Sequence, residues 1–173
     1  MKPVPSIRPA DAADAEAICA IYNDGIAGRQ ATFETAPRTI GEVLAWFESG
    51  RPFFVAVDSE RRVVGWARVS AYSDRQAYAG VGEHGVYVAP DARGQGIGRR
   101  LLEQLASAAE DAGYYKLTSR VFTTNEASLA VHRAAGFFEV GVQPRHGLLD
   151  GEWKDCVLVE RLLGEAAEDA PHR

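Results

Sequence analysis

The sequence has 173 residues, of which 46% are hydrophobic and 25% are charged, and this predicts one ordinary globular domain. The formal net charge of −5 argues against a nucleic-acid partner held by a broad basic face. No apolar run is long enough to span a membrane, and the first residues lack the apolar stretch of a secretory signal. Cys19 and Cys156 lie far apart in sequence, which is typical of two reduced thiols. We therefore expect a cytoplasmic protein without a membrane or nucleic-acid partner.

Apolar periodicity and turn residues predict strands that alternate with helices. The first helix carries the stripe Ala17, Ile18, Ile21 and Tyr22, and Thr39 precedes the second helix in a capping box with Glu42. The predicted strands, in chain order, are 6–9, 53–57, 63–70, 84–88, 116–121, 137–142 and 156–162, and the predicted helices are 11–26, 40–48, 97–112 and 127–135.

This order of elements predicts an α/β fold with a mixed sheet flanked by about four helices. Strand–helix–strand units at both ends of the chain imply parallel strand pairs, and the hairpin across 58–62 implies an antiparallel pair. We expect one domain over 1–163, followed by a disordered acidic tail over 164–173.

Three glycines at alternate positions, Gly94, Gly96 and Gly98, separate a buried strand from a long helix. Glycine permits a positive φ and a close approach by a ligand, and the helix N-terminus adds unpaired N–H groups. Arg93 and Arg99 add positive charge, so the segment is predicted to bind a phosphate or pyrophosphate. The alternative is a tight turn without a ligand.

The sequence does not match the other common glycine-rich phosphate-binding motifs. No Gly-Lys-Ser/Thr follows the turn, and the third glycine of a dinucleotide fingerprint is replaced by Arg99. The segment 80–85 matches G-x-G-x-x-G literally, but a strand follows it and no helix begins there, so the match is accidental.

The segment 93–98, Arg-Gly-Gln-Gly-Ile-Gly, resembles the R/Q-x-x-G-x-G/A element of the GNAT acyltransferase superfamily. The segment 125–137 resembles that family's second landmark, with Asn125, Ser128 and Gly136-Phe137 in place. Within the superfamily the chain resembles the phosphinothricin-type N-acetyltransferases, including the arsinothricin-resistance branch. The matching pieces are 7–10, 21–23, 31–35, 75–78, 83–88 and 150–155.

The resemblance implies a homodimer that uses acetyl-CoA to acetylate the amino group of a glutamate-like phosphinic or arsinic amino acid. No metal is expected, because His84 and His146 have no partner at a metal-ligand spacing. The residues that the resemblance assigns to acetyl-CoA are Val86, Tyr87, Val88, Arg93, Gly94, Gln95, Gly96, Ile97, Gly98, Arg99, Asn125 and Ser128.

The resemblance also assigns two catalytic residues. Glu83 matches the family's general base, which removes the proton that an ammonium group must lose before it attacks a thioester. His132 stands where many relatives carry a tyrosine that protonates the leaving thiolate, and it shares a helix face with Ser128. The alternatives are a solvated loop acid for Glu83 and a packed helix residue for His132.

Three residues are assigned to the acceptor. Arg75 offers a planar fork suited to a carboxylate, phosphinate or arsinate, and Tyr78 lies in the same segment. Phe33 is expected to form a wall of the pocket. An uninvolved surface arginine and a core phenylalanine are the corresponding alternatives.

Two other functions remain open from the sequence. One is an acetyltransferase for another small amine or for a protein N-terminus. The other is an acetyl-CoA-binding module without catalysis, against which the presence of Glu83 and Arg75 argues.

Overall fold

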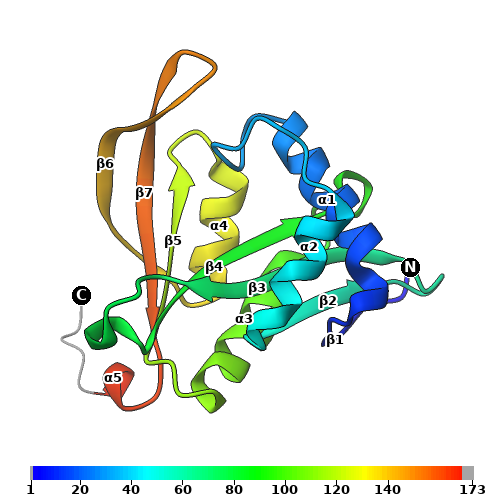
Figure 1. Cartoon of the computed structure of the whole chain (residues 1–173), viewed down its shortest axis with the longest axis horizontal. Helices are drawn as coiled ribbons and strands as arrows, with labels where there is room; N and C mark the ends of the chain where they lie inside the picture. Colours follow the sequence, from blue (N-terminus) through cyan, green and yellow to red (C-terminus); the bar gives the residue numbers. More distant parts are fainter. Residues whose placement is uncertain (1, 169–173) are drawn as a thin grey trace.

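The computed structural model describes residues 2–168 and contains a seven-stranded mixed sheet in the order β1-β2-β3-β4-β5-β7-β6 (Figure 1). The strands are β1 Ser6–Pro9, β2 Phe53–Val57, β3 Val63–Ala71, β4 Val81–Val88, β5 Lys116–Phe122, β6 Phe138–Leu149 and β7 Glu152–Leu162. The α-helices are α1 Ala15–Ala27, α2 Ile40–Trp46, α3 Ile97–Asp111, α4 Glu126–Ala134 and α5 Glu165–Glu168. The predicted α/β class with a mixed sheet is confirmed.

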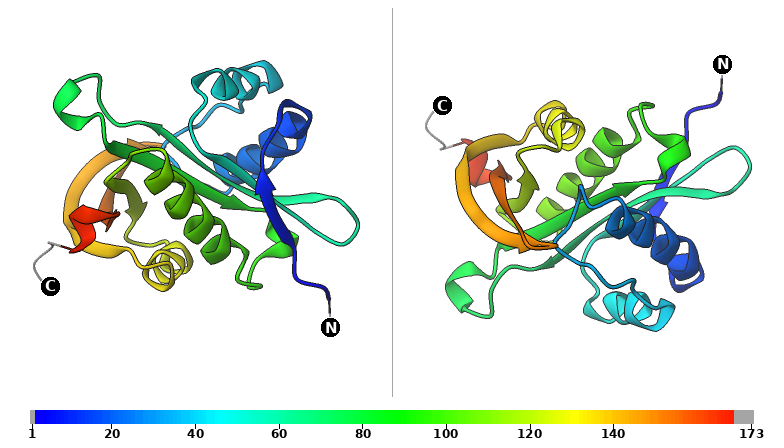
Figure 2. Two further views of the ribbon diagram at one scale, coloured as in Figure 1. Left: turned by 90° about the horizontal axis from the view of Figure 1, so that it is seen from below. Right: turned by 90° about the horizontal axis from the view of Figure 1, so that it is seen from above.

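Helices cover both faces of the sheet. Helices α1 and α2 lie on one face, and α3 and α4 lie on the other (Figure 2). On the α3 side, Leu101, Leu102 and Leu105 are fully buried. On the α1 side, the buried Trp66 contacts the aromatic rings of Tyr22 and Tyr87. The sheet is therefore packed on both sides, and apolar burial stabilises both layers.

Two of the implied parallel pairs are absent, because β1 and β2 pair antiparallel and β7 lies between β5 and β6. The β1–β2 pair is antiparallel, although a strand–helix–strand unit had implied a parallel pair. Two helices, α1 and α2, connect these strands, so the chain crosses the sheet face twice and returns in the opposite direction. The parallel pair in the described sheet is β4–β5, which the single helix α3 connects.

Most of the predicted ends of helices and strands lie within a few residues of the observed ends. The capping box at the start of α2 is present, since the Thr39 side chain accepts from the Glu42 N–H and the Glu42 carboxylate accepts from the Thr39 N–H. Strand β4 begins at Val81, three residues earlier than predicted, so Glu83 lies within the strand rather than in a loop before it.

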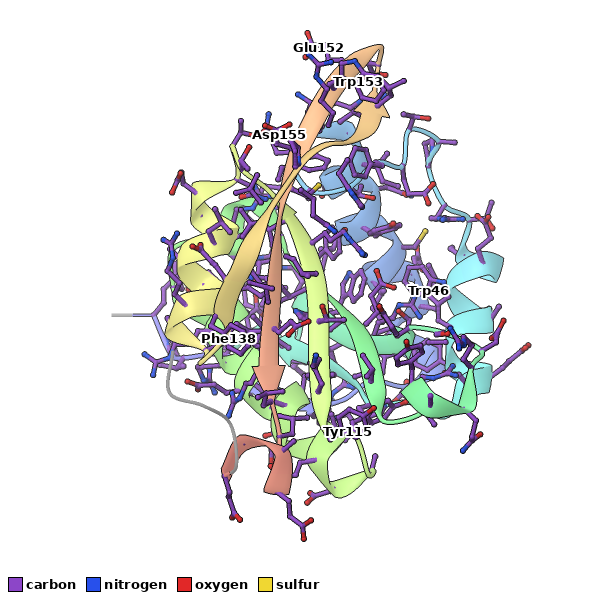
Figure 3. All side chains as sticks on the ribbon, turned by 90° about the vertical axis from the view of Figure 1, so that its left-hand side faces the viewer. Trp46, Tyr115, Phe138, Glu152, Trp153 and Asp155 are labelled. Atoms are coloured by element: carbon purple, nitrogen blue, oxygen red, sulfur yellow. The ribbon has the colours of Figure 1, made fainter. Side chains whose placement is uncertain are left out.

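The C-terminal part of the chain differs more from the prediction. Strands β6 and β7 extend into a long hairpin whose tip carries Glu152 and Trp153 (Figure 3). Residues 165–168, within the segment predicted to be disordered, form α5, and residues 169–173 of that segment lie outside the described residues. Over residues 2–168, no helix has the length and apolar character that crossing a membrane requires. Cys19 and Cys156 are free and buried.

Candidate active site

The site is built around a gap between two neighbouring strands. Strands β4 and β5 pair over only three registers, the last of which joins Glu83 to Thr118, and beyond it they diverge (Figure 1). A cavity of about 720 Å³ lies at this divergence, lined on one side by residues 83–88 of β4 and on the other by 119–122 of β5. Because 84–88 pair only with β3, their backbone groups on the β5 side are free to meet a ligand.

The glycine turn closes one end of the cavity. Gly94 and Gly96 both have φ of +76°, and Gly96 is the residue from which α3 begins. An added Cβ at either position would meet no atom within 4 Å, so the turn needs glycine for its backbone conformation rather than for space. Gly98 differs, because a Cβ there would lie 3.1 Å from the Val131 side chain. The turn thus exposes the N-terminal N–H groups of a long helix to the cavity, which suits an anion.

The three arginines near the glycine turn have different hydrogen-bond partners. Arg93 lines the cavity and donates from Nε to the Val88 carbonyl at 3.3 Å. Arg99 instead forms an ion pair with Glu103 at 2.8 Å, and Arg100 donates to the Pro5 carbonyl. Of the twelve residues assigned to acetyl-CoA, ten line the cavity, and Gln95 and Arg99 do not.

Glu83 lies where the strands part, and it lines the cavity. Its carboxylate forms no hydrogen bond or ion pair with any of residues 2–168. Its register partners are Ser70 on β3 and Thr118 on β5, so the sheet fixes the backbone on both sides. A carboxylate held this way is free to accept a proton or hydrogen bond from a bound amine.

His132 and His84 form a buried pair inside the cavity wall. Their Nε2 atoms are 3.0 Å apart, and Nδ1 of His132 lies 2.8 Å from the Ser128 carbonyl oxygen. A carbonyl only accepts, so His132 Nδ1 donates to it, and in the neutral pair His84 Nε2–H donates to His132 Nε2. Burial lowers the pKa of both rings, and in His84 the charge of His132 lowers it further. Both nitrogens of His132 are therefore engaged.

Asn125 begins α4 and ties it to another segment. Its side-chain oxygen accepts from the Ser128 N–H at 3.2 Å, and its amide donates to the Gln30 carbonyl at 3.0 Å. The residue thus caps the helix and holds the loop after α1 against the cavity that both segments line.

Aromatic side chains form another part of the cavity wall. Phe33 packs edge-on against Phe122, with ring centroids 4.8 Å apart, and both line the cavity. A Cβ on Gly147 of β6 would lie 2.6 Å from the Phe33 ring, so the β6 backbone presses directly on this wall. Arg120 and His146 line the same cavity.

Arg75 and Tyr78 lie elsewhere. They line a second hollow of about 220 Å³ together with Arg51 and Tyr72, and they do not line the main cavity. The Arg75 guanidinium lies 5.6 Å from the Tyr78 ring centroid and has no acidic partner among residues 2–168. Arg75, which was predicted to bind the anionic group of the acceptor, therefore lies outside the cavity that Glu83 lines.

His84 and Arg120 are among the cavity residues that the sequence analysis did not assign to the site. His84 is next to Glu83 and 48 residues from its partner His132, so no local spacing could have indicated the pair. Arg120 lies in the β5 run Lys116–Phe122, whose Thr, Val and Phe residues favour a strand but indicate nothing about a ligand.

Three comparisons with known proteins bear on this site. Residues 18–137 match the Acetyltransferase (GNAT) family. An L-methionine sulfoximine/L-methionine sulfone acetyltransferase of Pseudomonas paraeruginosa is 34% identical over 159 residues, which cover 90% of this chain and 92% of that protein. A phosphinothricin N-acetyltransferase of Alcaligenes faecalis is 36% identical over 163 residues, covering 91% and 82% of the two chains.

A solved structure is also similar over nearly the whole chain. The phosphinothricin acetyltransferase of Sinorhizobium meliloti in complex with AcCoA has a TM-score of 0.90 and 32% sequence identity, covering 99% of this chain and 95% of that one. The protein described here therefore belongs to the GNAT acetyltransferase family, and its class is an N-acetyltransferase.

Proposed function

We propose that this protein transfers the acetyl group of acetyl-CoA to the amino group of a small amino acid related to glutamate. Phosphinothricin, methionine sulfoximine and arsinothricin are the substrates that we expect it to accept, and the outcome for a cell would be resistance to them. The observation that carries the proposal is one continuous cavity, which joins an anion-binding glycine turn to the unpartnered carboxylate of Glu83. The activities for which the relatives are named support the substrate class.

The cavity fits acetyl-CoA on chemical grounds. Gly94 and Gly96 hold a turn that leaves open space above the start of α3, which suits a pyrophosphate. The unpaired edge of β4 over 84–88 can pair with the amides of a pantetheine arm. Acetyl-CoA supplies the thioester carbonyl, and the remaining chemistry falls to the residues of this chain.

Glu83 would accept the proton that the substrate ammonium must lose, directly or through a water molecule. The neutral amine then attacks the thioester carbonyl, a C–N bond forms and the C–S bond breaks. The nitrogen loses one further proton to become an amide, and the leaving thiolate takes up a proton. No acyl-enzyme is required, and neither cysteine lines the cavity. His132 remains the predicted donor of that proton. Its proton lies on Nδ1 and is bonded to the Ser128 carbonyl, so His132 would have to release that bond to act.

We also infer a cytoplasmic homodimer. Exposed apolar side chains on the β6–β7 hairpin support the dimer: Leu148 and Trp153 are cross-strand partners, and they are 54% and 56% exposed. Apolar side chains gathered on a projecting hairpin are typical of an interaction surface.

The test of the function is a release assay for free thiol with purified protein and acetyl-CoA. The panel contains phosphinothricin, methionine sulfoximine, arsinothricin, simple amines and short peptides. Thiol release with the amino acids, with the N-acetylated product identified by mass, is the expected result. Turnover of amines or peptides alone would establish a different acceptor class, and no turnover with any compound would indicate a binding module.

A further inference from the structure

Arg120 lies on the same face of the sheet as Glu83. Side chains alternate along β5, so Thr118, Arg120 and Phe122 share one face. Thr118 is the register partner of Glu83, and side chains of directly paired residues point to the same side of a sheet. Phe122 on this face packs against Phe33 in the loop after α1, so the face is the one that α1 and that loop cover.

The spacing between Arg120 and Glu83 suits a small ligand that carries an amine at one end and a second polar group at the other. Two residues along a strand and one step between strands separate their backbones by roughly 8 Å. A ligand whose amine meets Glu83 could therefore place a group at the end of its side chain against Arg120. An α-carboxylate lies too close to the amine to span this separation.

The guanidinium of Arg120 is held in place, and it lacks a countercharge. Its Nε donates to Gln143 Oε1 at 2.8 Å, which leaves the terminal amino groups without a hydrogen-bond partner among residues 2–168. No acidic residue of that range pairs with it. Burial raises the pKa of the Cys156 thiol and the Arg120 charge opposes the rise, so the charge lies near the small cluster of Phe33, Phe122 and Cys156.

The other cations are less suited to the acceptor. Among residues 2–168, the arginines that line the cavity are Arg93 and Arg120. Arg93 lies at the glycine turn, bonded to the Val88 carbonyl, and Arg75 opens onto the second hollow.

We propose that Arg120 binds the anionic group at the side-chain end of the acceptor, and that it selects anionic acceptors over neutral ones of the same shape. The inference rests on the proposed function, since it concerns the acceptor of that reaction. A guanidinium fork binds a phosphinate or carboxylate by two parallel charged hydrogen bonds. The aromatic wall of Phe33 and Phe122 would pack against the alkyl part of the same side chain.

Phosphinothricin and methionine sulfone provide a matched pair of acceptors. Their side chains have the same length and a similar tetrahedral end, but the phosphinate is anionic and the sulfone is neutral. The experiment measures kcat and KM for both compounds in the wild type and in Arg120→Gln, Arg120→Lys, Arg75→Gln and Arg61→Gln. Arg61 lies in the exposed turn between β2 and β3, away from the cavity, and its variant controls for the loss of one positive charge.

In the wild type we expect KM for phosphinothricin to be about tenfold or more below KM for methionine sulfone, the usual worth of a charged hydrogen bond. Arg120→Gln should raise KM for phosphinothricin by about tenfold and leave KM for the sulfone and both kcat values unchanged. Arg120→Lys should recover part of the preference, because it retains the charge without the fork. Arg61→Gln should behave as wild type.

Two results would overturn the assignment while the proposed function stands. The first is that Arg120→Gln keeps the full preference for phosphinothricin. The second is that Arg75→Gln loses this preference while Arg120→Gln keeps it. If the wild type acetylates neither these two compounds nor the other amino acids of the panel, the proposed function fails, and this inference fails with it.

Discussion

The buried histidine pair makes the stability of the fold sensitive to mild acid. His84 is 4% exposed and His132 is 3% exposed, and burial holds the pKa of both rings below that of a histidine in the unfolded chain. The unfolded chain therefore binds more protons than the folded one as the pH falls below about 6.5. Stability contributed by the neutral pair is fully present above that pH and is lost as the pH falls towards the folded-state pKa values.

The magnitude follows from linkage. A histidine with an unfolded pKa of about 6.5 that stays neutral in the fold lowers the free energy of unfolding by roughly 1 kcal/mol between pH 7.5 and pH 5.5. Two such residues would contribute roughly 2–3 kcal/mol. Partial protonation of His132 in the fold would bring this sum closer to the contribution of one residue.

Urea unfolding at the two pH values measures this loss. His84→Gln retains a donor for His132 but cannot titrate, so it should lose roughly 1 kcal/mol less than the wild type over the same interval. His146→Gln, which removes an exposed imidazole, is the matched control and should lose as much as the wild type. The reasoning is refuted if His84→Gln and the wild type lose equal amounts.

Two further substitutions test other parts of the site and of the assembly. Gly96→Ala places a side chain at φ of +76° and should cost about 1–2 kcal/mol, so acetyl-CoA binding measured by calorimetry should weaken about tenfold as the turn changes conformation. Gly50→Ala, at φ of +65° and also in open space, should leave binding unchanged, and unchanged binding in Gly96→Ala would remove the turn from the cofactor site. Trp153→Glu should convert the expected dimer into a monomer in sedimentation analysis, and a persistent dimer would place the interface elsewhere.

The sequence predicts those features that depend on neighbouring residues. The turn at Gly94 and Gly96, the capping box of Thr39 and Glu42, and most element ends follow from local backbone preferences, and the structure contains them. The antiparallel direction of the β1–β2 pair was not predicted, because strand direction depends on how often the chain crosses the sheet.

Features that join distant segments were not predictable in the same way. His84 and His132 meet only after β4 and α4 pack together, and Arg120 reaches the cavity only because β5 diverges from β4 beyond Thr118. Arg75 follows the family pattern in sequence, yet it lines a different hollow from Glu83. Resemblance therefore indicated the chemistry, whereas the placement of these side chains required the fold.

The central claim is that the cavity catalyses acetyl transfer with Glu83 as its base, and Glu83→Gln tests it most directly. The measurement is kcat for phosphinothricin at saturating acetyl-CoA, together with the Kd for acetyl-CoA by calorimetry. Because the Glu83 carboxylate has no partner among residues 2–168, the amide should leave the fold and the Kd unchanged. Turnover should fall by roughly 10²–10⁴-fold, the usual worth of general-base catalysis. Turnover within about threefold of wild type, with normal binding of acetyl-CoA, would contradict the account.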